Sequence, residues 1–248
     1  MTEAFKPIAV RRSSDNPALF WTRCRVDLQL LTIYNFLRQP LMAATGQLLD
    51  VGAGESPWRD LMPSVVEYAA VDIDSSPEFG MRRHSDMQYY DGVRLPFADD
   101  SFDVILCTEV LEHVRDPASF LKDLNRVLRR GGTLILTVPW SARMHHIPYD
   151  FSRFSRFGLE ANLQAAHFSE VEISERGNDI TVIANKLTVL MVRLLLPSRK
   201  SLAILNWLGC LAMFPITLFF LGLAHLSLTF NFGSKDDPLG YGVIAKKN

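Results

Sequence analysis

The sequence predicts an α/β protein with a doubly wound, mostly parallel sheet of seven strands. Short apolar runs alternate with helical patterns along the chain, which is typical of strands joined by crossover helices. The run at 102–108 is almost continuously apolar, as expected for a strand in a sheet covered on both faces. A glycine-rich turn follows the first run and an acidic residue ends the second, which is typical of a nucleotide-binding edge.

The composition narrows the classes of protein that fit the chain. It has 248 residues, of which 48% are hydrophobic and 21% are charged, so we expect one domain with additions and a sizeable core. The net charge is -1 at pH 7. Because the chain lacks an overall basic balance, no nucleic acid is expected as a partner.

Cysteine usage favours a reducing compartment. Cys24, Cys107 and Cys210 lie far apart and are odd in number, so free thiols are expected. No cluster of cysteines and histidines along the chain predicts a metal site. The first residues lack an apolar signal core, so we expect no secretory signal peptide and a cytoplasmic location.

Residues 1–45 precede the sheet. They are expected to form a polar arm and then one helix from Pro17 to about Arg38, because apolar residues recur there at helical spacing. Such a helix would complete the core or cover the ligand-binding edge of the sheet.

The glycine-rich turn follows the first strand, expected at 47–51. Gly52 and Gly54 lack a Cβ, so the backbone can turn tightly there and lie against a ligand. A short helix or turn is expected at 57–62. About 20 residues beyond the glycines, an acidic residue at the end of the second strand binds a ribose diol in nucleotide-binding sheets. Asp72 occupies this position, although Asp74 could take the role and Asp72 could be an ordinary strand-end aspartate.

The same alternation predicts the remaining elements. Further strands are expected at 65–73, 84–90, 102–108, 132–138, 170–174 and 240–245. One helix should open with Asp116 as N-cap and Pro117 as its first residue, and end at Gly131 or Gly132. Another helix is expected over 155–167.

Two longer motifs resemble those of a known family. The segment 95–103 reads LPFADDSFD, and 107–114 reads CTEVLEHV. With both motifs, residues 48–139 resemble the class I S-adenosylmethionine-dependent methyltransferases, of the type 11-like kind with an LPF-x-D-x-SFD loop and an LEH segment. The resemblance implies a Rossmann-like sheet with an antiparallel last strand, and S-adenosyl-L-methionine as the cofactor. It says nothing about the acceptor.

The resemblance also implies roles at the cofactor. Gly52 and Gly54 would hold the methionyl end through backbone groups. Asp50 or Glu55 can meet the amino group, and the family pattern points to Asp50. Asp72 would take the ribose, although Asp74 competes for that role.

Two further groups of residues complete this assignment. The adenine would lie near Asp91, Gly92 and Val93, while Thr108 and Glu109 would face the transferred methyl group. The turn continues with Ser56 and Pro57 where a third glycine is common. Pro57 removes one N–H donor, which would lower the affinity for the cofactor.

The segment 144–154 supplies the candidates for catalysis. It resembles the H-x-x-P-x-D-x-x-R-F loop of many methyltransferases of this group. His145 or His146 could take a proton from a hydroxyl acceptor, with Asp150 beside them. In the alternative, both are solvated loop histidines, and Asp150 and Arg153 form a structural pair. His113 is expected to pack and hydrogen-bond near the cofactor.

A hydrophobic insertion, 179–237, separates the last two strands. Its segment 202–230 contains no Asp, Glu, Lys or Arg and is long enough to cross a bilayer. Because both ends must return to one sheet, we expect helices that lie on or dip into a membrane surface through 187–230. Two full crossings, a homodimer interface and a cap on the catalytic domain remain as alternatives.

The chain therefore divides into an arm and helix at 1–45, a cofactor-binding domain at 46–178 plus 238–248, and the insertion at 179–237. We expect methyl transfer to a small-molecule acceptor that is lipophilic or linked to a lipid or glycan, at the inner face of a membrane. A homo-oligomer is compatible with this. The alternatives are a nicotinamide-dependent oxidoreductase and a catalytically silent module of the same fold.

Overall fold

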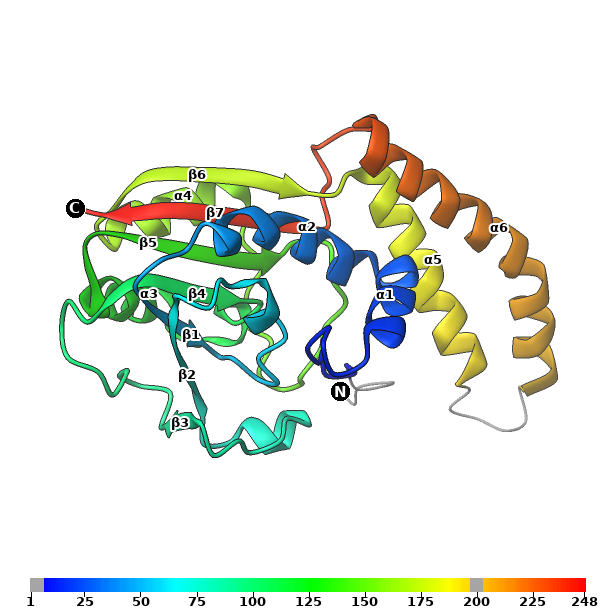
Figure 1. Cartoon of the computed structure of the whole chain (residues 1–248). Helices are drawn as coiled ribbons and strands as arrows, with labels where there is room; N and C mark the ends of the chain where they lie inside the picture. Colours follow the sequence, from blue (N-terminus) through cyan, green and yellow to red (C-terminus); the bar gives the residue numbers. More distant parts are fainter. Residues whose placement is uncertain (1–6, 197–202) are drawn as a thin grey trace.

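The computed structural model describes residues 7–196 and 203–248 of the chain (Figure 1). Within these residues one sheet runs in the order β3-β2-β1-β4-β5-β7-β6, with β7 antiparallel to both neighbours and the other pairs parallel. This confirms the predicted doubly wound, Rossmann-like sheet. The strands are β1 (Gln47–Val51), β2 (Glu67–Ile73), β3 (Met87–Tyr90), β4 (Phe102–Thr108), β5 (Leu128–Pro139), β6 (Phe168–Arg176) and β7 (Gly240–Lys247).

Helices cover both faces of the sheet. The described α-helices are α1 (Pro17–Val26), α2 (Leu28–Met42), α3 (Pro117–Val127), α4 (Arg156–Ala165), α5 (Asp179–Leu195) and α6 (Ala203–Phe230). Short 3-10 helices are η1 (Arg59–Leu61), η2 (Ser76–Phe79) and η3 (Leu111–His113). On one face, α3 packs its apolar side against β5 and α4 packs against β6, within one buried cluster. On the other face, α2 packs against the sheet, and α1 packs on α2.

The expected single helix from Pro17 to about Arg38 is wrong, because Asp27 divides it into α1 and α2. Its backbone leaves the helical region at φ -95 and ψ 88, and its carboxylate accepts the backbone N–H of Leu30. Asp27 thus caps α2. A lone acidic residue inside an apolar periodic pattern gives no clear sign of such a break.

The end of α3 also differs from the expectation. The helix stops at Val127, and β5 begins at Leu128, so Gly131 and Gly132 lie inside the strand rather than at the helix end. Leu128 is fully buried and pairs with Phe102 of β4, so its place in the sheet ends the helix. The other strands lie where they were expected, with ends shifted by a few residues.

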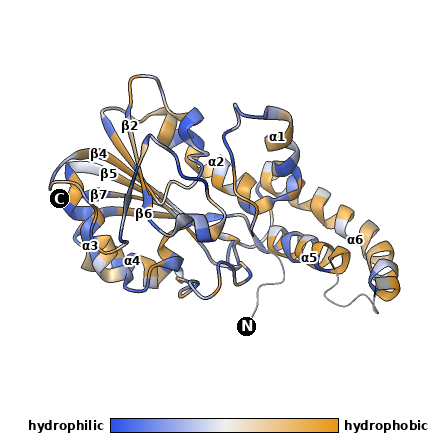
Figure 2. Cartoon of the chain, turned by 90° about the horizontal axis from the view of Figure 1, so that it is seen from below, coloured by the Kyte–Doolittle hydropathy of each residue, from blue (hydrophilic) through white to orange (hydrophobic). Residues whose placement is uncertain are grey.

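The insertion is a helical hairpin that projects from the sheet (Figures 1 and 2). Helices α5 and α6 lie side by side, and α6 carries Pro215 inside it. Its segment Ile204–Phe230 is long and apolar enough to cross a membrane, and only 17% of its most apolar window is buried. Hydrophobic side chains that elsewhere form the core are thus exposed along α6.

The foot of the hairpin is tied to the rest of the molecule. Leu28 of α2, Val182 of α5, Ala224 of α6 and Leu239 before β7 form one buried cluster. Asn178 caps α5 by accepting the N–H of Thr181, and its amide group donates to Ser227 and to the carbonyl of Phe232. One side chain therefore joins the start of α5 to the end of α6.

Candidate functional site

The glycine turn after β1 lies at the carboxyl edge of the sheet. Gly52 has φ +70, and its N–H donates to the carbonyl of Val71 in β2. A Cβ on Gly52 would lie 2.4 Å from Cγ2 of Val110, so no larger residue fits there without movement. Gly54 also has a positive φ, of +55. Gly52 is thus required by the close contact with Val110, and Gly54 adopts the left-handed conformation that glycine favours.

Asp72 fixes this turn to the neighbouring strand. Its side-chain oxygens accept the N–H of Gly54 at 2.9 Å and its neighbour Ile73 at 2.7 Å. Asp72 is buried, and burial raises its pKa although these two hydrogen bonds oppose the shift. Asp74 instead lies at the surface and pairs with Arg83. Of the two carboxylates considered for the ribose, Asp72 is the one attached to the turn.

Asp50 lies at the end of β1, immediately before the turn. It is 1% exposed, and one carboxylate oxygen accepts the hydroxyl of Tyr68 at 2.8 Å. Burial raises the pKa of Asp50 to about 7, although the bond from Tyr68 lowers it. Its other oxygen, Oδ1, has no hydrogen-bond partner among the described residues. An acceptor of this kind fits the amino group of the cofactor.

Glu55, the other candidate for the amino group, has partners of its own. One oxygen accepts the N–H of Arg82 at 2.8 Å, and the other lies 3.4 Å from Nε2 of His84. Glu55 therefore holds the segment after η2 against the glycine turn. The unpartnered oxygen favours Asp50 over Glu55.

The ends of β3 and β4 complete the edge. Asp91, Gly92 and Val93 follow β3 and are exposed, and Asp91 accepts the N–H of Val93. Thr108 ends β4, and its hydroxyl accepts the indole N–H of Trp58 at 3.1 Å. The structure thus brings the predicted adenine and methyl regions to the edge that carries the glycine turn.

Glu109 has a buried partner that the sequence did not reveal. Its carboxylate accepts a guanidinium N–H of Arg176 at 2.7 Å, and its backbone has φ +54. Arg176 is 2% exposed and also donates to the carbonyls of Val138 and Tyr241. This arginine connects the end of β6 to the end of β4. Nothing in a solitary arginine at a strand end predicts such a contact.

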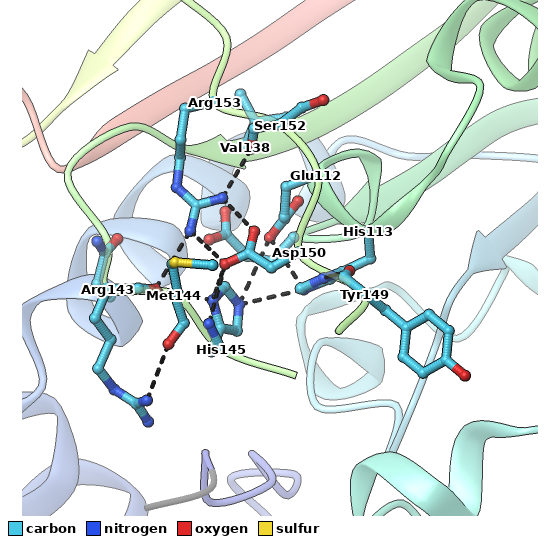
Figure 3. Close-up of polar contacts among 12 residues, drawn as sticks. Glu112, His113, Val138, Arg143, Met144, His145, Tyr149, Asp150, Ser152 and Arg153 are labelled. Carbon is cyan, nitrogen blue, oxygen red and sulfur yellow. Dashed lines mark hydrogen bonds and ion pairs between the residues drawn. The ribbon is translucent and has the colours of Figure 1, made fainter. Parts of the chain in front are cut away.

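The loop after β5 folds over the same edge (Figure 3). Asp150 has a side chain that is 2% exposed; it pairs with Arg153 and accepts the N–H of His145 at 3.0 Å. Its carboxylate therefore holds the loop in shape, which is the structural role left open as an alternative. His146 has φ +52, and its ring lies against Phe79.

His113 and His145 meet across this loop. Their Nε2 atoms are 3.2 Å apart, and His113 Nδ1 lies 2.7 Å from the carbonyl oxygen of Tyr149. Burial and the neighbouring His113 lower the pKa of His145 to about 4, so this ring is neutral at pH 7. The sequence did not place His113 beside the predicted histidines, because about 30 residues separate them.

Glu112 is the residue of this group that sequence reasoning missed. It is fully buried, and neither carboxylate oxygen has a hydrogen-bond partner among the described residues. Burial and nearby Glu109 raise its pKa well above the ordinary value. Glu112 belongs to the LEH segment, but nothing in that segment indicates that the Glu112 side chain points inward toward two histidines.

The sheet order, the antiparallel β7 and the turn held by Asp72 define a Rossmann-like domain of the methyltransferase class. Residues 49–136 match the family described as a methyltransferase domain, and this part of the chain belongs to that family. S-adenosyl-L-methionine is the cofactor of the class, and the buried, unpartnered oxygen of Asp50 suits its amino group.

Relatives agree over the same region. A "Probable S-adenosylmethionine-dependent methyltransferase" of Mycolicibacterium smegmatis is 31% identical over 96 residues, which is 37% of each chain. A demethylmenaquinone methyltransferase of Staphylococcus saprophyticus is 34% identical over 97 residues, 35% of this chain and 42% of the relative. The chain thus matches well under half the length of these curated relatives.

Solved structures show the fold. A methyltransferase from Archaeoglobus fulgidus described as SAM dependent superposes with a TM-score of 0.53 at 16% identity, covering 94% of this chain and 100% of the other. The [4+2]-cyclase SpnF superposes with a TM-score of 0.51 at 18% identity, covering 88% and 82%. Since one fold carries both descriptions, the fold alone does not fix the reaction.

Proposed function

We propose that this protein transfers a methyl group from S-adenosyl-L-methionine to a small-molecule acceptor that is lipophilic or linked to a lipid or glycan. The observation that carries the transfer is the glycine turn fixed by Asp72 within a segment that matches the methyltransferase family. The nicotinamide alternative has no comparable support, because the family match covers the same glycine turn and strand ends.

The residues of the edge have separate tasks in this reaction. When bound, the cofactor supplies an activated methyl group on a sulfonium, so the protein mainly positions the two reactants. Gly52 and Gly54 let the backbone approach the methionyl end, and Asp50 offers Oδ1 to the amino group. Asp72 keeps lone pairs for the ribose hydroxyls beyond the two amides that it already accepts.

The acceptor would arrive at the histidine side of the edge. Phe79 and Tyr149 lie beside the histidines there, with ring centroids 5.4 Å apart. Apolar rings beside polar side chains suit an acceptor with both a ring or chain and a polar head. This is the support within the site for a lipophilic acceptor.

The hairpin supports a membrane location for the acceptor. Along α6, Trp207, Leu211 and Phe219 are each at least 65% exposed. Soluble monomers rarely leave so large an apolar surface uncovered, so a lipid surface is the partner we propose. Because both ends of the hairpin return to one sheet, in-plane or re-entrant helices at the inner face of a membrane fit this arrangement.

Calorimetric titration with S-adenosylmethionine, and separately with NADH, tests the cofactor. We expect the full chain in mild detergent to bind the first and not the second. Asp72→Ala should weaken binding at least tenfold, while the surface variant Asp74→Ala should bind like the parent protein. Binding of NADH alone, or equal effects of the two variants, would contradict the assignment.

Flotation with liposomes tests the membrane partner. The full chain should float with vesicles of mixed zwitterionic and anionic lipids, and the double variant Leu211→Gln with Phe219→Gln should stay in the soluble fraction. The double variant should still bind S-adenosylmethionine, because both residues lie on α6, away from the cofactor edge. If instead the parent protein forms a detergent-resistant dimer and does not float, α6 is a subunit interface.

A further inference from the structure

Three side chains at the carboxyl edge point acceptor atoms at one another (Figure 3). Nε2 of His113 lies 3.2 Å from Nε2 of His145, and one Glu112 oxygen lies 3.6 Å and 3.9 Å from those two nitrogens. A ring nitrogen of His146 completes a group of three imidazoles whose atoms all lie within 4.8 Å of one another. The group comes from two segments, η3 and the loop after β5.

The hydrogen bonds on the far side of the two rings fix their tautomers. Nδ1 of His113 faces the carbonyl of Tyr149 at 2.7 Å, and Nδ1 of His145 faces the carbonyl of Arg143 at 3.1 Å. A carbonyl oxygen only accepts, so each Nδ1 must carry its proton. In neutral rings both Nε2 atoms then present lone pairs to each other.

This leaves three groups together that share no donor unless the Glu112 carboxyl holds a proton, which its raised pKa favours when no cation is bound. The two Nε2 lone pairs converge, and the fully buried Glu112 carboxylate beside them has no hydrogen-bond partner among the described residues. A proton on one Nε2 would satisfy the histidine pair but would leave the carboxylate unpaired. Buried acceptors without donors are unfavourable, and a cation at their centre removes the problem.

The spacing fits a metal ion. A point equidistant from three atoms with these separations lies about 2.1 Å from each, which is the distance at which zinc binds imidazole nitrogen and carboxylate oxygen. Ligating histidines characteristically donate their other N–H to a backbone carbonyl, as His113 and His145 do. Asp150 adds support by accepting the backbone N–H of His145.

We propose that Glu112, His113 and His145 form a binding site for one divalent transition-metal ion, with His146 beside it. Two imidazoles and a carboxylate suit zinc and similar metals, and such a set leaves coordination positions open. No metal site was expected from the sequence, because His145 lies 32 residues from His113 along the chain.

The open coordination positions on the ion indicate the class of acceptor. This inference rests on the proposed methyl transfer. An acceptor with a hydroxyl group can place its oxygen on the ion, which lowers the pKa of that hydroxyl. The proton passes to solvent water; the oxygen then forms its bond to the methyl carbon as the bond from carbon to the sulfonium sulfur breaks. The site therefore predicts O-methylation rather than methylation of carbon.

Metal binding can be tested on the full chain without its acceptor. After treatment with chelator, the protein should bind one equivalent of Zn2+ or Co2+ by calorimetry, and the Co2+ form should show visible d–d absorption bands. His113→Ala and His145→Ala should each weaken binding at least a hundredfold, and the isosteric Glu112→Gln at least tenfold. His167→Asn, at a distant exposed histidine, should leave binding unchanged.

The outcomes separate this proposal from the proposed function. Absence of stoichiometric Zn2+ and Co2+ binding by folded protein, or variants that bind like the parent, would overturn the metal site, as would binding of Mg2+ alone. Since the Co2+ spectrum is read on the unaltered chain, a variant that fails to fold does not decide the result. Titration with S-adenosylmethionine on the same samples reports separately on the cofactor site.

Discussion

At the residue scale, the glycine turn is the feature most sensitive to a single substitution. Gly52→Ala should weaken binding of S-adenosylmethionine at least tenfold, because the new methyl group would lie 2.4 Å from Cγ2 of Val110 at a backbone φ of +70. Left-handed backbone costs a non-glycine residue on the order of 1 kcal/mol, and the collision adds to it. Calorimetric titration measures the loss.

Two variants separate the collision from the backbone strain. Gly80→Ala also places a side chain at positive φ, here +86, but meets nothing within 4 Å, so it should keep cofactor affinity. Adding Val110→Ala to Gly52→Ala should restore part of the binding. An unimproved double variant would mean that strain alone, and not contact with Val110, disables the turn.

Asp50 should make stability depend on pH. Burial raises the pKa of Asp50 to about 7 in the folded state, from the ordinary value of 3.8. Because the folded value is the higher one, its contribution to stability is fully present below about pH 4 and is lost as pH rises through 7. The protein should therefore unfold at a lower temperature at pH 8 than at pH 5.5.

The uncharged variant Asp50→Asn tests whether Asp50 causes this dependence of stability on pH. Asp50→Asn should flatten the slope between pH 5.5 and 8, a difference of about 2 kcal/mol, because about 1.5 pH units separate pH 5.5 from the folded pKa and each unit is worth about 1.4 kcal/mol. Thermal unfolding of both proteins across this range gives the comparison. An unchanged slope in the variant would assign the pH dependence to other groups.

Residues were predicted from sequence where their role is local to the chain. The backbone conformation of Gly52 and Gly54 follows from the turn itself, and Asp72 lies at a strand end whose position is readable. Glu112 and Arg176 were missed, because their partners come from segments distant in the sequence. Burial of a charged side chain depends on the packing of several elements, which no local pattern contains.

At the element scale, Asn178 makes the hydrogen bonds that join the two helices at the foot of the hairpin. Asn178→Ala should cost about 2 to 3 kcal/mol, because it removes an N-cap and also the bonds to Ser227 and to the carbonyl of Phe232. Denaturant unfolding in mild detergent measures the cost. Hydrogen exchange should become faster at the start of α5 and the end of α6.

A second asparagine cap in the chain provides the control. Asn16 caps α1 by accepting the N–H of Leu19, in exposed surroundings. Asn16→Ala should cost about 1 kcal/mol, the usual value of a cap alone. Equal losses for the two variants would show that Asn178 acts only as a cap and does not join α5 to α6.

Elements were predicted well where apolar runs are short and bounded by glycine, proline or acidic residues. All seven strands and their order of appearance were recovered. The break between α1 and α2 was missed, because Asp27 signals it through its own capping bond. The start of β5 was missed, because Leu128 suits a helix and a strand equally and only its pairing with Phe102 decides.

At the scale of the whole molecule, Trp207 offers a signal for membrane contact. It is 65% exposed on α6, whereas Trp58 is buried beside the glycine turn. Addition of lipid vesicles should shift the tryptophan emission of the protein to shorter wavelength, because the indole of Trp207 leaves water for lipid. Trp207→Phe should remove this shift and should retain S-adenosylmethionine binding. A shift that persists in the variant would place the contact elsewhere.

The position of β7 has a consequence for the way the molecule is made. β7 is synthesised after the hairpin, yet it lies between β5 and β6, and among the strands that the structure describes β6 pairs with β7 alone. During synthesis, Leu134 of β5 cannot pair with Ala245, nor Ile173 of β6 with Val243, until β7 has left the ribosome. These pairings close long stretches of chain and therefore form late. Both helices of the hairpin leave the ribosome before β7 fills its place between β5 and β6. A nascent chain can therefore reach a lipid surface or a chaperone through its hairpin before the catalytic half is closed.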